Sequence, residues 1–281
     1  MKIDSVVVLY NPEEIILKNI LSYISFIDKL YIVDNSDVKK YDLIEKIVAV
    51  SAKCNYVDNY GNKGIAHALN VGVKLAIENG ADWLLTMDQD SSFNNNDLQK
   101  IIEELHAIND NEIAILSPSH YKDEQKLNPF YNTITMTSGN FINLDILHKI
   151  GSFDENLFID SVDTEFCLRI YANNYKIKRL PLIILEHNLG EIRKYNFLGL
   201  KFGPTNHNKI RRYYIIRNRF YVWEKYKNIY PDFIKWEKLA TLKEIIKIIL
   251  FEKDKLSKIR FSIKGYLDFK KNKFGKYKNA N

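Results

Sequence analysis

The sequence predicts an α/β fold built on a mainly parallel sheet, and three observations support this prediction. Short apolar runs alternate with amphipathic segments over the first 117 residues, which is the pattern of strands joined by helical crossovers. Polar residues follow several of these runs directly, as expected where strands end at a ligand-binding edge. Gly80 follows a long amphipathic segment, at the place where helices commonly end.

The individual elements follow from local patterns in chain order. Asn11-Pro12 ends the first strand, and Pro12 with two acidic residues then opens a helix. Residues 131–144 favour β structure around Ser138-Gly139-Asn140, and the chain is expected to be helical beyond residue 208. The other expected strands cover residues 3–10, 29–34, 55–58, 82–87, 113–117 and 177–185. The expected helices cover residues 12–27, 42–48, 65–79, 97–109, 145–150 and 161–173.

Composition narrows the class of protein. The 281 residues, 46% of them hydrophobic, suit one large domain with an appendage. Cys54 and Cys167 are far apart and lack CxxC spacing, so neither a disulfide framework nor a zinc site is expected. The N-terminus does not match a signal peptide, and the apolar run at residues 245–251 is too short to span a bilayer. The expected location is therefore the cytoplasm.

The net charge of +6 is concentrated at the C-terminal end. Residues 225–281 carry 16 Lys/Arg against 6 Asp/Glu, whereas residues 1–224 have a net charge of −4. Apolar residues recur at helical spacing over residues 233–269, with lysines between them. This extension is expected either to pack on the body or on a second subunit, giving a homodimer, or to bind the inner face of an anionic membrane peripherally. No nucleic-acid motif accompanies it, so nucleic acid is not an expected partner.

Polar residues cluster after the early strands. They are Tyr10-Asn11, Asp34-Asn35, the loop Asn59–Gly64, and the pair Asp88 and Asp90. Ligands of open parallel sheets gather at the carboxyl ends of strands, so these clusters are expected to line one cleft. A nucleotide would suit them, although neither GxGxxG nor GxxxxGK[ST] is present.

The pair Asp88 and Asp90 ends a strand that otherwise looks buried. Residues i and i+2 of a strand point the same way, so both carboxylates can face one point. That point suits a hard divalent cation, Mg²⁺ or Mn²⁺, bound by oxygen together with a diphosphate. The alternative is a solvated strand end without a ligand.

A second group of carboxylates, Asp160, Asp163 and Glu165, stands at the start of a predicted helix. Asp163 and Glu165 are two residues apart and cannot share a helical face. One of the group is therefore available as a general base beside a sugar hydroxyl. Capping of the helix is the alternative role.

At this point the residues resemble a known family. The stretches VVVLYNP, IVDNS, NKGIAHALNVGV, DWLLTMDQDS, SGNFI, GSFDENLFIDSVDTEFCLR, HNLGE and RRYYIIRNR occur in the order and rough spacing of the family 2 inverting glycosyltransferases. The resemblance covers about residues 4–225 and is closest to bacterial rhamnosyltransferases that use dTDP-L-rhamnose. It implies a GT-A fold over residues 1–225, with a nucleotide-sugar half at 1–117 and an acceptor half at 118–225. Residues 226–281 form the basic helical extension.

The resemblance also implies roles for individual residues. Tyr10, Asn11 and Asp34 would line the base and ribose pocket, and Asn62, Lys63 and Gly64 would lie near the nucleotide. Asp88 would face the ribose, Asp90 would hold Mg²⁺ or Mn²⁺, and His187 would reach the metal or the diphosphate. Asp163 matches the catalytic Asp of the family's Glu-Asp pair. Val162 replaces the Glu, which leaves Asp160 or Glu165 as stand-ins. Gly139 would lie on the acceptor side, and Arg217 would neutralise phosphate.

The implied reaction is a single displacement in which Asp163 deprotonates an acceptor hydroxyl. The implied donor is dTDP-rhamnose, and the implied acceptor is a saccharide or a polyprenyl-diphosphate-linked saccharide of a cell-surface polysaccharide. Two alternatives stay open at this point. One is a transferase of the same family with a UDP-hexose or UDP-galactofuranose donor. The other is a protein of another class that binds polyanions or membranes through its basic extension.

Overall fold

The computed structural model describes residues 1–121, 126, 130, 132–187, 195–197, 200–202 and 206–278. The chain divides into two compact units. Unit 1 comprises Met1–Glu155 and Val162–Asn188, and unit 2 comprises Asn156–Ser161 and Leu189–Asn281. The helix over residues 209–226 therefore groups with the C-terminal helices, whereas a boundary at residue 225 was expected from the sequence. No helix in the described ranges is long and apolar enough to cross a membrane.

Unit 1 is built on a seven-stranded sheet in the order β3-β2-β1-β4-β7-β6-β8. Within this sheet β7 is antiparallel to its two neighbours, and the other pairs of adjacent strands are parallel. The strands are β1 Ile3–Leu9, β2 Lys29–Asp34, β3 Cys54–Asp58, β4 Trp83–Asp88, β6 Ile113–Ser119, β7 Asn140–Asn143 and β8 Lys176–Ile184. Two short strands, β5 Ser91–Ser92 and β9 Glu186–His187, form a separate antiparallel pair. The predicted mainly parallel sheet is thus confirmed.

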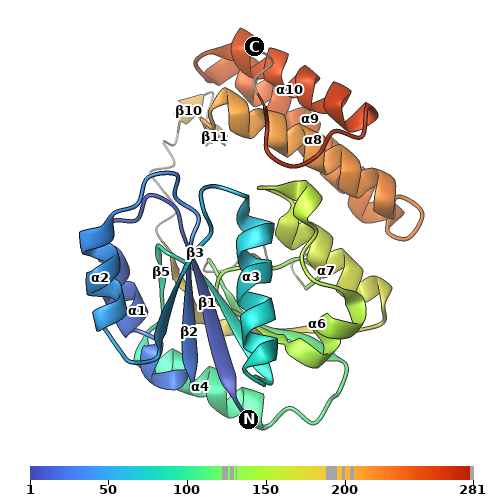
Figure 1. Ribbon diagram of the computed structural model, residues 1–281. Coiled ribbons are helices and arrows are strands. Elements are labelled where there is room, and N and C mark those ends of the chain that lie inside the picture. Colours follow the sequence, from blue (N-terminus) through green and yellow to red (C-terminus); the bar gives the residue numbers. More distant parts are fainter. Residues whose placement is uncertain are drawn as a thin grey trace. The chain divides into compact units, whose positions relative to one another are not determined.

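Helices cover both faces of this sheet, as Figure 1 shows for α1 and α2 on one side and α3 on the other. Alternate strand residues such as Val7 and Leu85 pack against α1, α2 and α4 in one apolar core. The helices of unit 1 are α1 Ile15–Leu21, α2 Tyr41–Ala49, α3 Ile65–Glu78, α4 Asn95–His106, α6 Leu144–Ile150 and α7 Val162–Ala172. Two 3₁₀ turns, η1 Ile24–Phe26 and η2 Glu155–Leu157, accompany them, η2 continuing into unit 2.

Two expected elements differ from the structure. The helix expected over residues 12–27 is the shorter α1 followed by η1, because the chain turns at Ser22 before it enters β2. The β structure expected over residues 131–144 is confined to β7 among the residues described there. The Asn140 side chain instead donates to the Met136 carbonyl in a turn, and the Thr135 and Ser138 hydroxyls bond Ser117 and Ser91, which competes with a regular ladder.

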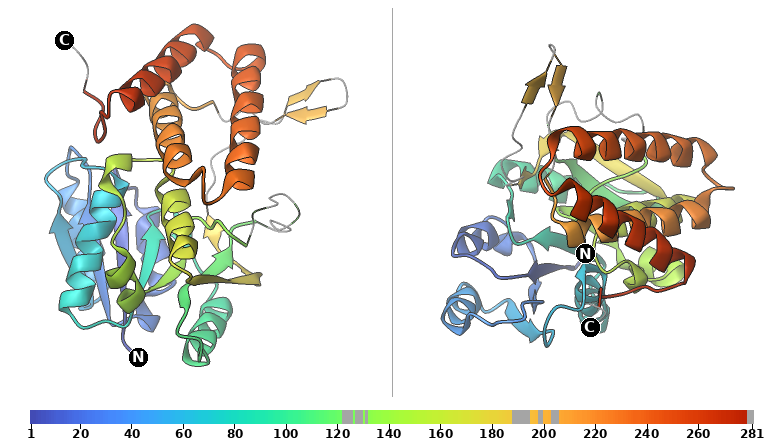
Figure 2. Two further views of the ribbon diagram at one scale, coloured as in Figure 1. Left: turned by 90° about the vertical axis from the view of Figure 1, so that its right-hand side faces the viewer. Right: turned by 90° about the horizontal axis from the view of Figure 1, so that it is seen from above.

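Unit 2 contains three helices, α8 Lys209–Tyr226, α9 Pro231–Phe251 and α10 Lys255–Lys270, and a hairpin of β10 Tyr195–Phe197 and β11 Leu200–Phe202. Figure 2 shows these helices and the hairpin from two further directions. α10 packs closely along α8 because Gly265 has no side chain. A Cβ atom there would lie 2.4 Å from the Tyr213 carbonyl oxygen. The expected helical C-terminal extension is confirmed.

Candidate active site

The strand ends of unit 1 bring most of the predicted site residues to one edge of the sheet. In the parallel registers Leu9 lies beside Asp34, and Val8 lies beside Asp88. The connection after β1 leads to β2 on one side, whereas β4 lies on the other side of β1. The carboxyl ends of β1 and β4 therefore flank a switch point in strand order, where ligands of open α/β sheets bind.

Short polar bridges hold these strand ends together. The Tyr10 backbone N–H donates to the Gln89 side-chain oxygen at 2.9 Å, and the Gln89 amide donates back to the Tyr10 carbonyl at 3.1 Å. The Asn11 N–H donates to Ser36 Oγ at 2.8 Å, and Asn11 has a left-handed backbone with φ of 49°. The Tyr10 side chain stays exposed beside this bridge. Gln89 thus fixes the end of β1 against the end of β4, a role that the sequence pattern did not predict.

Three asparagines fix the loop before α3. Asn35 Oδ1 accepts from Asn59 Nδ2 at 2.8 Å and from the Lys63 N–H at 2.9 Å. Asn35 Nδ2 donates to Asn62 Oδ1 at 3.1 Å, and the same oxygen accepts from the Gly64 N–H at 3.0 Å. The backbone of the predicted nucleotide loop is therefore shaped by side-chain amides. The sequence predicted that Asn35 and Asn59 lie among the polar residues after the strands. It did not predict which groups their side chains bond.

Asp34 lies below the edge and does not present its carboxylate to solvent. It is 1% exposed, and its oxygens accept from the Ser36 N–H at 2.9 Å and the Tyr56 hydroxyl at 3.1 Å. Lys39 lies 3.5 Å from Asp34 Oδ2 and 2.8 Å from Asp58 Oδ1. Burial, reinforced by Asp34, raises the pKa of Tyr56, which keeps this hydroxyl protonated as a donor. Asp34 thus braces the strand ends, and its expected contact with the base or ribose stays a prediction.

Asp88 is the last residue of the otherwise buried strand β4, Asp90 follows it, and both are half-buried. The Asp88 N–H donates to Ser138 Oγ at 3.0 Å, and Ser138 Oγ donates to Ser91 Oγ at 2.9 Å. Ser91 pairs with the backbone of His187 across β5 and β9, whereas the His187 side chain lies outside the described residues. The sequence Asp88 to Ser91 is therefore held on both sides by backbone and hydroxyl contacts.

Gly139 serves the turn that supports Asp88. It has φ of 81°, and its N–H donates to the Thr86 carbonyl at 2.7 Å. An added Cβ atom would lie 3.0 Å from side-chain atoms of Leu185 and Pro118. Gly139 is buried in a tight bend, and its expected position on the acceptor side stays a prediction.

Asp163 lies at the same edge of unit 1 as these strand ends. α7 directly precedes β8, and β8 runs parallel to β6 and hence to β1 and β4. The end of α7 must therefore meet the amino end of β8, and its beginning points to the carboxyl edge. Asp163 stands in the first turn of α7, half-buried, with Oδ1 accepting from the Thr164 N–H at 2.8 Å.

Glu165, one of the two expected stand-ins for the missing acidic residue of the family's pair, is engaged inside the protein. It is fully buried and forms a two-pronged ion pair with Arg169, at 3.0 Å between Arg169 Nη2 and Glu165 Oε2. Arg169 also donates to the carbonyls of Ile150 and Ser152, so the pair fixes the chain that follows α6. Cys167 is buried nearby in the same helix, and burial raises the pKa of its thiol to about 12, which excludes a nucleophilic role.

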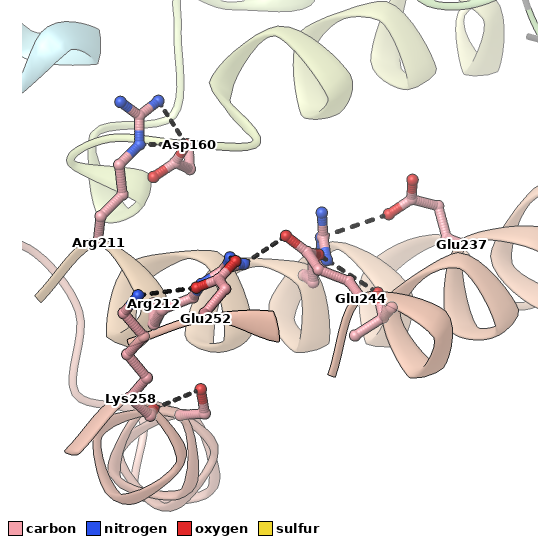
Figure 3. Close-up of polar contacts among 10 residues, drawn as sticks. Asp160, Arg211, Arg212, Glu237, Glu244, Glu252 and Lys258 are labelled. Carbon is pink, nitrogen blue, oxygen red and sulfur yellow. Dashed lines mark hydrogen bonds and ion pairs between the residues drawn. The ribbon is translucent and has the colours of Figure 1, made fainter. Parts of the chain in front are cut away.

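Asp160 belongs to unit 2 and pairs with Arg211 of α8, as Figure 3 shows. Asp160 Oδ1 accepts from Arg211 Nη2 at 3.0 Å and from Nε at 3.3 Å. Its other oxygen, Oδ2, is buried and has no hydrogen-bond partner among the described residues. Asp160 and Ser161 both have left-handed backbones, with φ of 65° and 63°. A buried carboxylate oxygen on a strained backbone is a feature typical of functional sites.

Arg217 and Asn218 hold the segment 156–161 that leads into α7. Asn218 Nδ2 donates to the carbonyls of Leu157 at 2.5 Å, Ile159 at 2.7 Å and Asp160 at 2.9 Å. Arg217 is 1% exposed and donates to Asn218 Oδ1 at 2.9 Å, the Asn156 carbonyl at 3.1 Å and the Gly275 carbonyl at 2.7 Å. All three guanidinium nitrogens are engaged. Arg217 therefore has a structural role in this segment, and its expected phosphate contact stays a prediction.

Comparison with known proteins identifies the family. The model of Glycosyl transferase family 2 matches residues 5–162, which is more than half of the chain. The chain belongs to this family. The predicted membership and glycosyltransferase activity are therefore confirmed, and the switch point, Asp88, Asp90 and the first turn of α7 all fall within or directly beside the matched region.

The chain is also similar to individual known proteins. This glycosyltransferase is 28% identical over 292 residues to a Shigella flexneri protein named dTDP-rhamnosyl transferase RfbF, covering 95% of this chain and 94% of that protein. A crystal structure of GalNAc-T7 with UDP, GalNAc and Mn²⁺ matches with a TM-score of 0.60 and 15% identity. The match covers 83% of this chain and about half, 50%, of that one, and it confirms the GT-A fold. A Staphylococcus aureus TarS structure, residues 1–349, has a TM-score of 0.46 at 19% identity over 64% of this chain and 58% of that one.

Replacing Asn218 with Leu is expected to destabilise unit 2 of the glycosyltransferase and to lower its activity. The change leaves three carbonyls of the buried segment without their donor, at a cost of about 1–3 kcal/mol for each group left unsatisfied. It also removes the bonds that support the left-handed residues Phe158, Asp160 and Ser161. Urea unfolding and a transfer assay would measure both effects. Asn173→Leu is the matched control, because Asn173 is exposed and donates to one carbonyl of its own helix.

Proposed function

We propose that this glycosyltransferase transfers L-rhamnose from dTDP-L-rhamnose, with inversion, to a hydroxyl of a saccharide or a polyprenyl-diphosphate-linked saccharide. The product would belong to a cell-surface polysaccharide. The identity of the donor is inferred from the Shigella flexneri relative. The similarity to that protein extends over nearly the whole of both chains and is not confined to the family core. The proposed acceptor follows from the resemblance stated above and is the less specific part.

The edge at β1 and β4 is the proposed donor site. The exposed Tyr10 ring and the loop Asn62–Gly64 stand where a nucleoside can lie against fixed backbone, and the ammonium group of Lys63 is available to a phosphate. The bridges through Gln89 and Asn35 keep this surface rigid. A preformed surface of this kind lowers the ordering cost of binding the donor.

Asp88 and Asp90 fit a divalent cation of the hard class. Both are half-buried oxygen donors at the end of one strand, with Asp88 fixed by Ser138. Among the described residues no group of three or more His, Cys, Asp or Glu side chains is arranged to hold a metal ion. One or two carboxylates together with substrate phosphates is the way Mg²⁺ is commonly bound. Asp90 would hold Mg²⁺ or Mn²⁺, and His187 stays a proposed further ligand. When bound, such an ion would stabilise negative charge on the diphosphate.

Asp163 is the proposed general base. Its position in the first turn of α7 favours the ionised form, because the helix N-terminus stabilises negative charge. The carboxylate takes the proton of the acceptor hydroxyl, and that oxygen forms a bond to the anomeric carbon of the donor. The bond from that carbon to the diphosphate breaks on the opposite face, and dTDP leaves with the electron pair. One displacement of this kind inverts the anomeric centre.

Calorimetric titration with dTDP-rhamnose and with UDP-sugars, each with and without Mg²⁺ or Mn²⁺, tests this function. We expect metal-dependent binding of dTDP-rhamnose by the wild type and at least about a tenfold loss in Asp90→Ala, since a good charge-assisted contact is worth more than one factor of ten. Asp97→Ala is the matched control, because Asp97 lies in the first turn of α4 and pairs with a neighbouring surface lysine.

The other outcomes of this titration separate the parts of the proposal. Tighter binding of a UDP-hexose or UDP-galactofuranose would keep the family and reject rhamnose. Equal binding with and without metal would reject the role of Asp90. Equal loss in Asp97→Ala would show that the variants affect folding and not the donor site.

A further inference from the structure

The outer side of α9 carries a continuous apolar stripe. Leu239, Leu242, Ile246, Ile249 and Leu250 are each 47–58% exposed. Their spacing of three, seven, ten and eleven residues from Leu239 places them on one face of the helix. We call these five residues the α9 outer face. The opposite side of the helix is buried in unit 2 through Phe233, Ile234 and Ile248.

The lysines and the glutamates of α9 lie on different sides of the helix. Exposed lysines accompany the outer face at Lys235, Lys238 and Lys243. The two glutamates of α9 turn inward, as Figure 3 shows. Glu237 lies 3.8 Å from Arg219, and Glu244 pairs with Arg219 at 2.5 Å and with Arg212. Between residues 235 and 250, α9 therefore shows apolar and cationic groups to its surroundings. Asp232, in the first turn, is the exposed carboxylate of the helix.

An open pocket lies at the first end of this stripe. It is lined by Lys227, Pro231, Ile234, Lys235, Lys238 and Leu239. Three lysines and three apolar residues thus line the pocket, and Lys227 also pairs with Glu224 at 2.6 Å. This arrangement matches the chemistry of an anionic phosphate headgroup above an acyl chain.

An apolar face of this kind suits either a second copy of the chain or a lipid surface. The charges around the α9 outer face distinguish between these two occupants. A second copy related by a two-fold axis would bring the lysines of one α9 against the lysines of the other. The inward glutamates, already paired with arginines, are not placed to offset that repulsion. An anionic lipid surface supplies apolar chains for the stripe and phosphates for the lysines together.

We propose that the α9 outer face, with Lys235, Lys238 and Lys243, lies on the surface of an anionic phospholipid membrane. The five apolar side chains enter the headgroup boundary, and the lysines contact lipid phosphates. The helix lies in the plane of the surface. This docking face is independent of the identity of the donor sugar, so it stands or falls separately from the proposed reaction.

Sedimentation of the full chain with vesicles tests the proposal. One set of vesicles contains phosphatidylcholine alone, and the other contains phosphatidylglycerol as well. We expect binding to the second set, weakened by high salt because the lysine contacts are screened. The variant Leu242→Asp/Ile246→Asp is expected to bind at least about tenfold more weakly, since two exposed apolar side chains that would enter the headgroup boundary are replaced by carboxylates.

The controls separate docking from folding. Leu182→Asp makes the same kind of change at a β8 side chain that is 93% exposed, and it should bind vesicles as the wild type does. The circular dichroism spectrum and donor titration should be unchanged in both variants. Equal binding by wild type and the α9 variant would overturn the proposal. A wild-type dimer that the α9 variant converts to a monomer, without vesicle binding by either, would assign the face to a second copy.

Discussion

Replacing Asp163 with Asn is expected to lower kcat/KM for sugar transfer by a factor of about 10² to 10⁴, the usual contribution of a positioned general base. The amide cannot accept the proton of the acceptor hydroxyl. Donor binding should change little, because the donor site is proposed at the ends of β1 and β4. Transfer assays under limiting acceptor, together with calorimetry of the donor, would measure the two quantities separately.

Asp145→Asn provides the matched control for this variant. Asp145 is exposed in the first turn of α6, as Asp163 is placed in the first turn of α7. Both changes remove a negative charge near a helix N-terminus, which costs about 0.3–1 kcal/mol of stability. A loss of activity confined to Asp163→Asn would therefore report chemistry and not helix stability.

Asp160 is the rival base, and the same assays distinguish it. Its buried oxygen Oδ2 has no hydrogen-bond partner in the part of the chain that the structure describes, and its backbone is left-handed, so the segment before α7 is under constraint. Asp163→Asn with more than a tenth of wild-type activity, beside an inactive Asp160→Asn, would move the base to Asp160. The bound donor must be retained in both variants for this comparison to hold.

The sheet and its polar edge were predictable from the sequence because both depend on local signals. Buried strands appear as apolar runs, and the residues after them are polar. The register that sets Leu9 beside Asp34 and Val8 beside Asp88 then follows from parallel pairing. Antiparallel β7 was not predictable in the same way, because its pairing with β4 and β6 depends on contacts between distant segments.

The side-chain networks were not predictable because each joins residues far apart in the chain. The three nitrogens of Arg217 bond residues up to 61 positions away, which its motif did not predict. Tyr56 and Ser36 donate to the oxygens of Asp34, which the sequence did not predict either. Motif spacing identifies charged residues that make specific contacts. It does not distinguish a contact with ligand from a contact with the protein's own backbone.

The contacts of the amphipathic C-terminal extension were likewise only partly predictable from the sequence. Helical spacing over residues 233–269 predicted apolar and basic faces, and the structure contains both. The spacing alone did not show which side packs inward. The inward side of α9 is set by its glutamates, because Arg212 and Arg219 of α8 supply their partners. The packing and membrane hypotheses are therefore compatible, one for each side of the helix.

Replacing Glu252 with Ala is expected to destabilise unit 2 by about 3–5 kcal/mol, the usual cost of breaking a buried ion pair. Glu252 is almost fully buried between Arg212 and Lys258, at 2.8 Å from each (Figure 3). Arg212 retains Glu244 in the variant. Although burial alone would raise it, the ion pairs with Arg219 and Arg212 lower the pKa of Glu244, so this partner stays ionised at neutral pH. Lys258, also buried, loses the ion pair that holds it.

The uncompensated charge of Lys258 therefore sets the size of the stability loss in Glu252→Ala, and a second substitution tests this. Lys258→Met in the Glu252→Ala background removes the uncompensated charge and should recover part of the lost stability, although each change alone is costly. Urea unfolding followed by circular dichroism would give the three free energies. Glu14→Ala is the surface control, because Glu14 and its partner Lys46 are 74% and 56% exposed and solvent screens such a pair. A Glu252→Ala cost as small as that of Glu14→Ala would mean that Lys258 reaches solvent in the variant, and the buried network would then not hold α8 to α10.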